Sequence, residues 1–363
     1  MMILSLIAVG FALIQFSVAL SNAIFRTNIP IGLPTSDSLI SILIPARNEE
    51  DNIARLLSDL VESKDANMEI LVLDDDSDDQ TAAVVAQFAK DDSRIKLIQS
   101  TNLPKGWLGK NFACYSLSHQ ARGNHFLFLD ADVRIKPGFI RSAVDWMQKK
   151  NLGLLTIFPK QEMHGIGERI TVPIMNYILL TLLPLPLVQQ LKFASLAAAN
   201  GQFMLFNSAT YKLLNPHEKE KGNKVEDIAI ARYYKSAKVS IACLLGDGSI
   251  RCRMYKGYKD SIKGFSKNLT EFFGGSFVVS MLFWFITTWG FIPIFISFGI
   301  KLSMAYLVIL IITRVLVSIA SNQNILNNII YLIPQQLNIG IILILAFRSK
   351  FFTGFLWKGR DIG

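Results

Sequence analysis

Long apolar segments at both ends of the sequence indicate a protein that is bound to a membrane. Residues 1–20 are almost wholly apolar, and they lack the basic front end and the small-residue cleavage site of a secretory signal peptide. Further apolar stretches, each about long enough to cross a ~30 Å hydrocarbon core, lie at 277–300, 302–320 and 325–347. Since 51% of the 363 residues are hydrophobic, we expect a retained N-terminal transmembrane anchor at 1–24 and C-terminal membrane helices at 276–347.

Basic residues gather beside the C-terminal apolar block. They are Arg251, Arg253, Lys256, Lys259, Lys263 and Lys267. Cations next to a membrane span mark the cytoplasmic side and are attracted to anionic lipid heads, so we expect a basic interfacial segment at 251–275 and no nucleic-acid partner. The prediction is a multi-pass protein of the inner (plasma) membrane whose aqueous domain lies in the cytoplasm.

The sequence leaves open on which side of the membrane the C-terminus lies. Three crossings after residue 276 would put the basic tail at 348–363 outside, against the positive-inside tendency. Either one apolar segment is re-entrant or the tail is an exception. The candidates for a re-entrant segment are 302–320, which contains Arg314, and the region of Gly290 and Pro293.

Cysteine and histidine residues give no sign of a disulfide framework or a zinc site. The cysteines are Cys114, Cys243 and Cys252, and neither they nor the four histidines show paired metal-ligand spacing. This usage agrees with a reducing cytoplasmic environment.

The region between the apolar blocks has the pattern of an α/β domain. Apolar runs of strand length alternate with segments that have helical spacing. The first expected strand begins at Ser41 and turns at Pro45, and the others are 69–76, 94–100 and 125–133. The helices between them are centred on 53–60, 81–90 and 111–123. This alternation predicts a mainly parallel sheet with helices on both faces, which we place in a domain at 38–250. Asn48 and Asp51 are expected to cap the first helix.

Clusters of aspartate follow two of the predicted strands. One cluster lies in "LDDDSDDQT", at 73–81, and the other is Asp130 with Asp132 in "FLDAD". In parallel sheets ligands bind at the carboxyl ends of the strands, where both clusters fall. Two acidic sites side by side repel each other unless a cation or hydrogen-bond donors lie between them, so the pair predicts a ligand. For Asp74 or Asp76 taken alone, capping of a turn is the preferred interpretation.

Asp130 and Asp132 are suited to a donor that carries a diphosphate. One carboxylate can face a ribose or an amide while the other binds Mg²⁺ or Mn²⁺, which take one or two carboxylates together with substrate phosphates. Lys110 in "GWLGKN" is a candidate phosphate contact, although this stretch lacks P-loop spacing, and the alternative is a solvated lysine at a helix start.

Asp227 is the candidate base. It stands at the start of a predicted helix, "EDIAIARYYK", where the helix N-terminus favours an ionised carboxylate that can accept a proton. Glu226 is interpreted first as an acid that stabilises the same helix turn.

Five motifs, in this order, give the chain a resemblance to the family 2 glycosyltransferases of GT-A fold. They are "ILIPARNEE", "LVLDDDSDDQT", "GKNFACYSLSHQARG", "FLDADV" and "VEDIAIARYYKSAK". The resemblance covers 41–238. It implies that Pro45, Arg47 and Glu49 line the nucleotide pocket. It also implies that Asp75 holds the base or ribose, that Asp132 binds the metal on the donor diphosphate, and that Asp227 is the general base.

The flanking segments resemble a narrower group of bacterial membrane enzymes. These glycosylate carotenoids, of the diaponeurosporenoate or hydroxychlorobactene type, and more distant relatives act on hopanoids or ceramide. In this group Asn200, Gly201 and Gln202 would lie beside the acceptor, although "ANGQF" also suits an ordinary turn. Many relatives have a [Q/R]xxRW motif after the base, whereas "RCRMY" here offers Arg251, Arg253 and Tyr255.

These observations predict an inverting, metal-dependent transferase at the cytoplasmic membrane face. It would move one hexose, with glucose favoured, from a UDP-sugar to a carotenoid or related isoprenoid lipid. The alternatives are a transferase that makes polyprenyl-phosphate sugars or polysaccharide, and a non-catalytic nucleotide-binding membrane protein.

Overall fold

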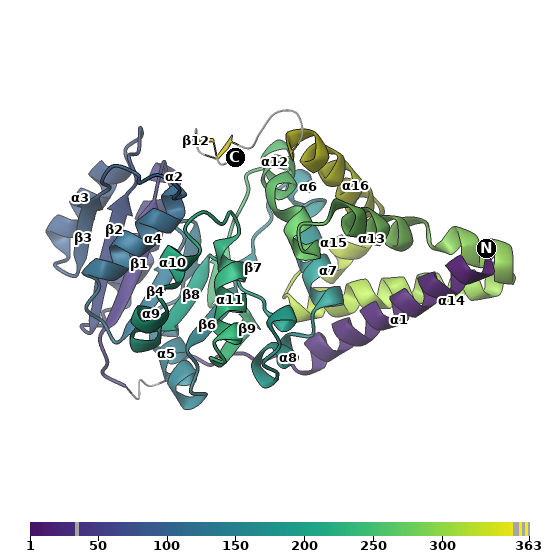
Figure 1. The fold of residues 1–363 in the computed structure, drawn as a ribbon, viewed down its shortest axis with the longest axis horizontal. Helices are drawn as coiled ribbons and strands as arrows, with labels where there is room; N and C mark the ends of the chain where they lie inside the picture. Colours follow the sequence, from purple (N-terminus) through teal and green to yellow (C-terminus); the bar gives the residue numbers. More distant parts are fainter. Residues whose placement is uncertain (33–35, 351–355, 358–359, 362–363) are drawn as a thin grey trace. The chain divides into compact units, whose positions relative to one another are not determined.

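The computed structural model describes residues 1–32 and 36–350, together with the backbone of 356–357 and 360–361 (Figure 1). The chain divides into two compact units. We call Thr27–Lys160 with Leu187–Cys252 the sheet unit, and Met1–Arg26, Gln161–Pro186 and Arg253–Gly363 the helical unit. Most of the basic tail expected at 348–363 lies outside the residues whose side chains are described.

The sheet unit contains a seven-stranded sheet in the order β3-β2-β1-β4-β8-β6-β9 (Figure 1). The bounds are β1 Ile40–Ala46, β2 Met68–Asp74, β3 Ile95–Gln99, β4 His125–Leu129, β6 Leu154–Phe158, β8 Phe203–Asn207 and β9 Ile241–Leu245. All neighbours run parallel except β8, which is antiparallel to both β4 and β6. The predicted mainly parallel sheet is confirmed.

Helices cover both faces of this sheet, and they account for the continuous apolar runs of its strands. In chain order they are α2 Glu50–Glu62, α3 Thr81–Asp91, α4 Gly109–Gln120, α5 Phe139–Lys149, η1 Ala194–Leu196, α9 Ser208–Leu214, α10 Pro216–Lys219 and α11 Glu226–Ser236. A small second sheet has the order β5-β10-β7, in which β5 Val133–Ile135 and β10 Ile250–Cys252 are antiparallel. The elements β7 Lys160–Gln161 and α8 Leu185–Gln190 straddle the unit boundaries.

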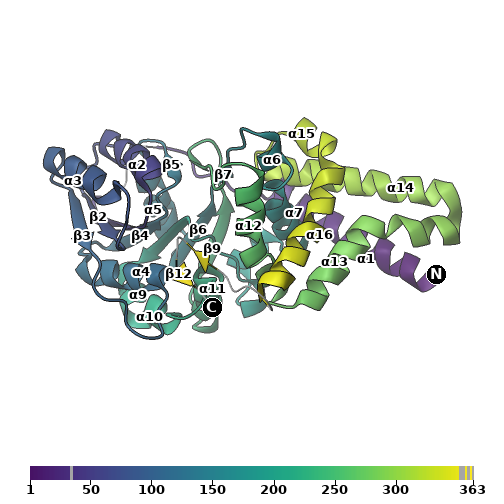
Figure 2. The same ribbon diagram turned by 90° about the horizontal axis from the view of Figure 1, so that it is seen from above.

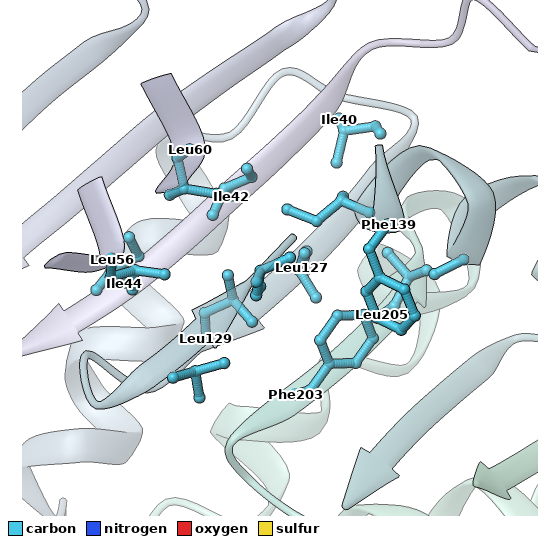
Figure 3. Packing of buried hydrophobic residues seen from close by; sticks show 14 of the residues in the cluster. Ile40, Ile42, Ile44, Leu56, Leu60, Leu127, Leu129, Phe139, Phe203 and Leu205 are labelled. Atoms are coloured by element: carbon cyan, nitrogen blue, oxygen red, sulfur yellow. The ribbon is translucent and has the colours of Figure 1, made fainter. Parts of the chain in front are cut away.

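Alternation along the strands divides the core into two layers. Ile42 and Ile44 of β1 pack with Leu56 and Leu60 of α2 on one face, as Figure 3 shows. The opposite face carries an aromatic cluster formed by Phe126, Phe128, Phe206, Tyr211, His217 and Tyr234. The period of two in the strands therefore gives each face its own apolar layer.

Truncation of Leu127, at the centre of the first layer, should destabilise the sheet unit. Leu127 is fully buried in β4, so Leu127→Ala is expected to lower the free energy of unfolding by about 2–5 kcal/mol. Leu213→Ala is the matched control, because Leu213 is 83% exposed on α9. Melting temperatures of the detergent-purified variants check this, and equal values for both would contradict it.

Among the described residues, the helical unit contains two stretches long and apolar enough to cross a membrane. These are α1 Met2–Ile24 and the segment Phe277–Ala320, which holds α13 Phe277–Trp289 and α14 Phe291–Ala320. At Gly299, φ is 74° and α14 is interrupted. Figure 2 shows α13 and α14 as two legs of a hairpin, and the Tyr306 hydroxyl donates a hydrogen bond to the Ile286 carbonyl across it. The hairpin turn falls at the boundary expected between the first two C-terminal segments.

α1 packs along this hairpin through small residues. Ala8 and Ala12 contact Ile294 and Tyr306, because small side chains allow helices to approach closely. Near the N-terminus, Ser5 bonds to Ser297 over 3.1 Å between the hydroxyl oxygens. At the other end, Arg26 donates to the Ile319 carbonyl over 3.2 Å, so α1 and the second half of α14 run in the same direction.

The third apolar segment does not form one continuous helix. It folds as two helices, α15 Ile325–Ile330 and α16 Leu332–Arg348. With 17 residues, α16 is shorter than α1 and than the segment Phe277–Ala320. The remaining elements of the unit are α6 Ile166–Arg169, α7 Pro173–Leu182, α12 Tyr258–Asn268, η2 Leu269–Phe273, β11 Leu356–Trp357 and β12 Arg360–Asp361. α7 is buried from Pro173 to Thr181, so this helix serves packing within the unit.

Candidate active site

The two aspartate clusters meet at one edge of the sheet. β2 ends at Asp74, and Asp130 directly follows β4. β1 lies between these strands and is parallel to both, so their carboxyl ends share an edge. The expected meeting of the two clusters at one edge is therefore confirmed, while a ligand site there and the roles of its residues stay predictions.

Backbone contacts tie the loops after β1 and β2 together. Arg47 is 9% exposed and donates hydrogen bonds to the carbonyl oxygens of Asp75 and Asp76. Asn48 has a positive φ of 51° and accepts a hydrogen bond from the Asp78 N–H, so the expected Asn48 cap of α2 is wrong. The observed N-cap residue is Glu49.

The other residues predicted for the nucleotide pocket lie at this same edge. Pro45 is in β1 beside Leu73 of β2, and Asp75 follows β2 with only 5% of its surface exposed. Part of the acidic run has a structural use, since Asp79 accepts hydrogen bonds from Thr81 at the start of α3 and from the Glu50 N–H. These hydrogen bonds outweigh burial and lower the pKa of Asp79.

Lys110 lies between Asp130, which follows β4, and Glu226 of α11. It is the second residue of α4, and its Nζ lies 2.9 Å from Asp130 Oδ1 and 3.3 Å from Glu226 Oε1. Burial alone would lower its pKa, but Asp130 and Glu226 raise the pKa well above the ordinary lysine value. The solvated-lysine interpretation is therefore wrong for Lys110, because it forms a charged cluster with carboxylates from β4 and α11.

Asp227 is held in one orientation by backbone donors. Its Oδ2 accepts a hydrogen bond of 2.9 Å from the Gly201 N–H, and its Oδ1 accepts one from the Ile228 N–H. Burial, followed by the charge of Glu226, raises its pKa from 3.8 to about 7, against the lowering effects of Lys110 and these N–H groups. A carboxylate with a pKa near neutrality is suited to accept a proton during a reaction at that pH.

The Asn200–Gln202 turn leads into β8 and faces this carboxylate. A Cβ added at Gly201 would lie 3.1 Å from Lys110 Nζ and 3.6 Å from Glu226 Oε1, so a side chain there would crowd the cluster. Asn200 and Thr156 exchange hydrogen bonds, which fix the turn. "ANGQF" is thus a turn whose glycine lets the backbone approach the charged groups.

Asp132 fits the role of a metal ligand. Its Oδ1 is buried and makes no hydrogen bond. Burial first, and then the charges of Asp130 and Glu49, raise its pKa from 3.8 to about 7. A cation would satisfy the orphaned oxygen and offset the repulsion between these carboxylates. Within the described parts of the chain no three His, Cys, Asp or Glu side chains form a metal cage, so donor phosphates would have to supply the other ligands.

Cys252 is a site residue that the sequence did not identify. Its thiol forms a hydrogen bond with Asp132, and Gln202 Nε2 donates to Cys252 Sγ over 2.8 Å. Burial raises the pKa of this thiol well above its usual value, which keeps it neutral. The acceptor-side role of Gln202 stays a prediction, and the "RCRMY" motif gave no signal of its contact with Cys252.

The remaining residues of that motif have structural contacts. Arg251 is exposed in β10 and lies opposite Arg134 of β5. In the helical unit Arg253 forms a salt bridge of 2.8 Å with buried Glu168, and Tyr255 stacks edge-on against Phe265. The predicted acceptor-side roles of these three residues stay predictions.

Comparison with known sequences agrees with this geometry. The family described as Glycosyl transferase family 2 matches residues 41–208. The 4,4'-diaponeurosporenoate glycosyltransferase of Staphylococcus haemolyticus (strain JCSC1435) is 26% identical over 239 residues, which are 63% of this chain and 60% of that protein. The protein of the same name in Staphylococcus aureus (strain USA300) is 27% identical over 271 residues, which are 74% of this chain and 70% of that one. The match thus spans less than two thirds of the first relative.

Among solved structures, the mannosyltransferase PcManGT from Pyrobaculum calidifontis, in complex with GDP-Man and Mn²⁺, has a similar fold. The TM-score is 0.54 at 14% sequence identity, and the alignment covers 96% of this chain and 99% of that chain. At this identity the likeness concerns the fold, and it agrees with the expected GT-A architecture.

Proposed function

Because the family described as Glycosyl transferase family 2 matches residues 41–208, we propose that the chain is an inverting glycosyltransferase. It moves one hexose from a nucleotide sugar, with UDP-glucose as the favoured donor, to a lipid acceptor at a membrane surface. The single observation that carries this proposal is the placement of Asp227. Its carboxylate is fixed by Gly201 and Ile228 beside the cluster of Lys110, Asp130 and Glu226, at the ligand-binding edge of the sheet.

In this proposal Asp227 removes the proton of the acceptor hydroxyl while the oxygen attacks the anomeric carbon of the sugar. The bond to the nucleoside diphosphate breaks on the opposite side, so the configuration inverts in one displacement. Lys110 and its carboxylates position the donor, and Arg47 with Asp75 shapes the loop that would face the nucleotide. A Mg²⁺ or Mn²⁺ ion, when bound by Asp132, would stabilise the charge that develops on the diphosphate.

The acceptor is proposed from the relatives and from the apolar helices. The two Staphylococcus proteins are named for diaponeurosporenoate, a carotenoid acid, so we place the acceptor among carotenoids and related isoprenoid lipids. Apolar helices at both ends would keep the protein in the membrane that contains such a lipid. The positive-inside tendency puts the aqueous domain on the cytoplasmic side of a plasma membrane.

A choice of acceptors tests this proposal against the polyprenyl-phosphate alternative. The purified protein is supplied with UDP-glucose, Mn²⁺ and either an isoprenoid alcohol, an isoprenoid acid or a polyprenyl phosphate, and the lipid products are identified by mass. Glycosylation of the alcohol or the acid supports the proposal. Transfer to polyprenyl phosphate alone would replace it with the alternative.

The raised pKa of Asp227 predicts a pH dependence. Because the ionised carboxylate is the active form and its pKa is about 7, kcat/KM with a hydroxyl acceptor should rise about tenfold per unit below pH 7 and level off above it. An acceptor carboxylate is already ionised at these pH values, so it should not show this rise. The profile of initial rates at saturating Mn²⁺ is the measurement. If the pH profile with a hydroxyl acceptor is the same for the wild type and Asp227→Asn, Asp227 is not the titrating base.

A further inference from the structure

α16 is an inverted amphipathic helix. Its buried face holds Gln335, Gln336 and Asn338, which are 0%, 6% and 4% exposed. Its outer face shows apolar side chains at helical spacing, and the preceding α15 continues the row. The row consists of Leu326, Ile330, Ile333, Leu337, Ile341 and Ile344, all between 42% and 68% exposed. Apolar residues outside and amides inside indicate that the outer face meets lipid rather than water.

The buried amides attach α16 to polar elements of the helical unit. Asn338 accepts a hydrogen bond of 2.7 Å from the Tyr258 hydroxyl of α12, and Gln335 donates one of 2.9 Å to the Arg169 carbonyl of α6. On the membrane side, Gln336 accepts a hydrogen bond of 2.6 Å from Arg314 of α14. α16 therefore lies at the junction of the apolar hairpin and the charged helix α12, and both views of the fold place it beside α12 (Figures 1 and 2).

Exposed cations lie on α12, which packs beside α16, and at the C-terminal end of α16. Lys259 and Lys263 of α12 are exposed, and so are Arg348 and Lys350 at the end of α16. An apolar stripe flanked by lysine and arginine matches the surface of a leaflet that contains anionic lipids, since the stripe enters the headgroup boundary while the cations contact lipid phosphates.

The length and the contacts of α16 argue against a crossing. Its 17 residues rise about 26 Å, less than the ~30 Å hydrocarbon core, and one face is occupied by α6 and α12. Phe347, near the end of the helix, stacks on Phe277, where the hairpin begins, with 5.0 Å between the ring centroids. The chain therefore leaves α16 at the open end of the hairpin, where Arg26, just after α1, also bonds to the Ile319 carbonyl.

We propose that α15 and α16 dock on an anionic leaflet surface without crossing it, and that the basic tail consequently lies on the same side as the sheet unit. With α1 and the two legs of the hairpin as the crossings, the tail obeys the positive-inside tendency. The candidates named from the sequence, 302–320 and the Gly290 region, are then not the non-crossing segment. This inference rests on the proposed membrane association, but not on the transferase activity.

Depth measurements test the docking. Single cysteines at Ile333, Leu337 and Ile344 in the full chain are labelled with an environment-sensitive dye, because the native cysteines are buried. The labelled protein is placed in phosphatidylglycerol–phosphatidylethanolamine vesicles with spin-labelled quenchers at two depths. A docked helix gives one shallow depth for all three positions, about 5–10 Å below the headgroups. A crossing helix gives depths that change by about 16 Å over the 11 residues and overturns the proposal.

Matched positions calibrate this experiment. A cysteine at Val308, 52% exposed in the second leg of the hairpin, should report a deep site. For sidedness, cysteines at Lys149 and Lys350 should react with an impermeant maleimide from the same side of sealed vesicles, and reaction from opposite sides would overturn the proposal. Binding of UDP, measured separately on each variant, shows whether the variant is folded. Depth and sidedness stay interpretable even if the protein transfers no sugar.

Discussion

Replacement of Asp227 by asparagine is expected to lower the turnover number with a hydroxyl acceptor about 10²- to 10⁴-fold, the usual contribution of a general base. Asparagine has nearly the same shape, and its side-chain oxygen can still accept a hydrogen bond from the Gly201 N–H. It cannot accept the proton of the acceptor. The site should therefore bind the donor as the wild type does but fail in the chemical step.

The measurement is kcat by release of UDP, together with the dissociation constant of UDP by calorimetry. Asp91→Asn is the matched control, because Asp91 is an exposed aspartate at the end of α3, and it should retain full activity. An Asp227→Asn protein that keeps more than a tenth of wild-type turnover would contradict the assignment. A loss of UDP binding would instead show that Asp227 holds the site together.

Asp132→Asn is expected to abolish the response to divalent metal. Even groups that only orient a metal ligand change metal affinity about 10- to 100-fold, so loss of the ligand itself should raise the half-saturating Mn²⁺ concentration by about 100-fold or more. Turnover at fixed Mn²⁺ should fall correspondingly. Titration of initial rates with Mn²⁺ measures both quantities, and an unchanged Mn²⁺ requirement would exclude Asp132 as the ligand.

A stability measurement supports the same assignment without using activity. Folding raises the pKa of Asp132 from 3.8 to about 7, so the folded state loses stability as pH rises from about 4 to 7, by roughly 4 kcal/mol at most. At pH 8 and without metal, Asp132→Asn should therefore melt at a higher temperature than the wild type. Mn²⁺ with UDP should raise the melting temperature of the wild type but not that of the variant.

The sheet and the location of the site could be predicted from the sequence because local patterns determine them. Apolar runs end at Asp74 and Asp130, and parallel strands bring such ends to one edge. Helical periodicity likewise identified α2, whose buried residues are Ile53, Leu56, Leu57 and Leu60, as expected. The start of α11 at Glu226 put Asp227 in a first helical turn, also as expected.

Contacts between distant segments could not be predicted in this way. Lys110 and Glu226 are far apart in the chain, and no local pattern distinguishes an ion-paired lysine from a solvated one. Asn48 has the composition of a helix cap, but the backbone needs a residue with positive φ there, and its side chain bonds to the neighbouring loop. The contact between Cys252 and Asp132 likewise depends on how β10 packs.

Hydropathy identified the third apolar segment but not its orientation. The exposed isoleucines and leucines of α15 and α16 give this segment the composition of a span. The glutamines and the asparagine of α16 can be recognised as buried contacts only from the structure, which shows their hydrogen bonds to α6 and α12. Hydropathy averaged over a window of the sequence does not show on which face of the helix the amides lie.

Transfer of labelled sugar into lipid tests the central claim most directly. The full-length protein in vesicles receives UDP-[¹⁴C]glucose, Mn²⁺ and an isoprenoid alcohol, and label is counted in the organic phase for wild type, Asp227→Asn and Asp132→Asn. We predict Mn²⁺-dependent label in lipid with the wild type and almost none with either variant. If neither this alcohol nor an isoprenoid acid takes up label from UDP-glucose or another nucleotide sugar, although the wild type binds UDP, the protein is not the proposed glycosyltransferase.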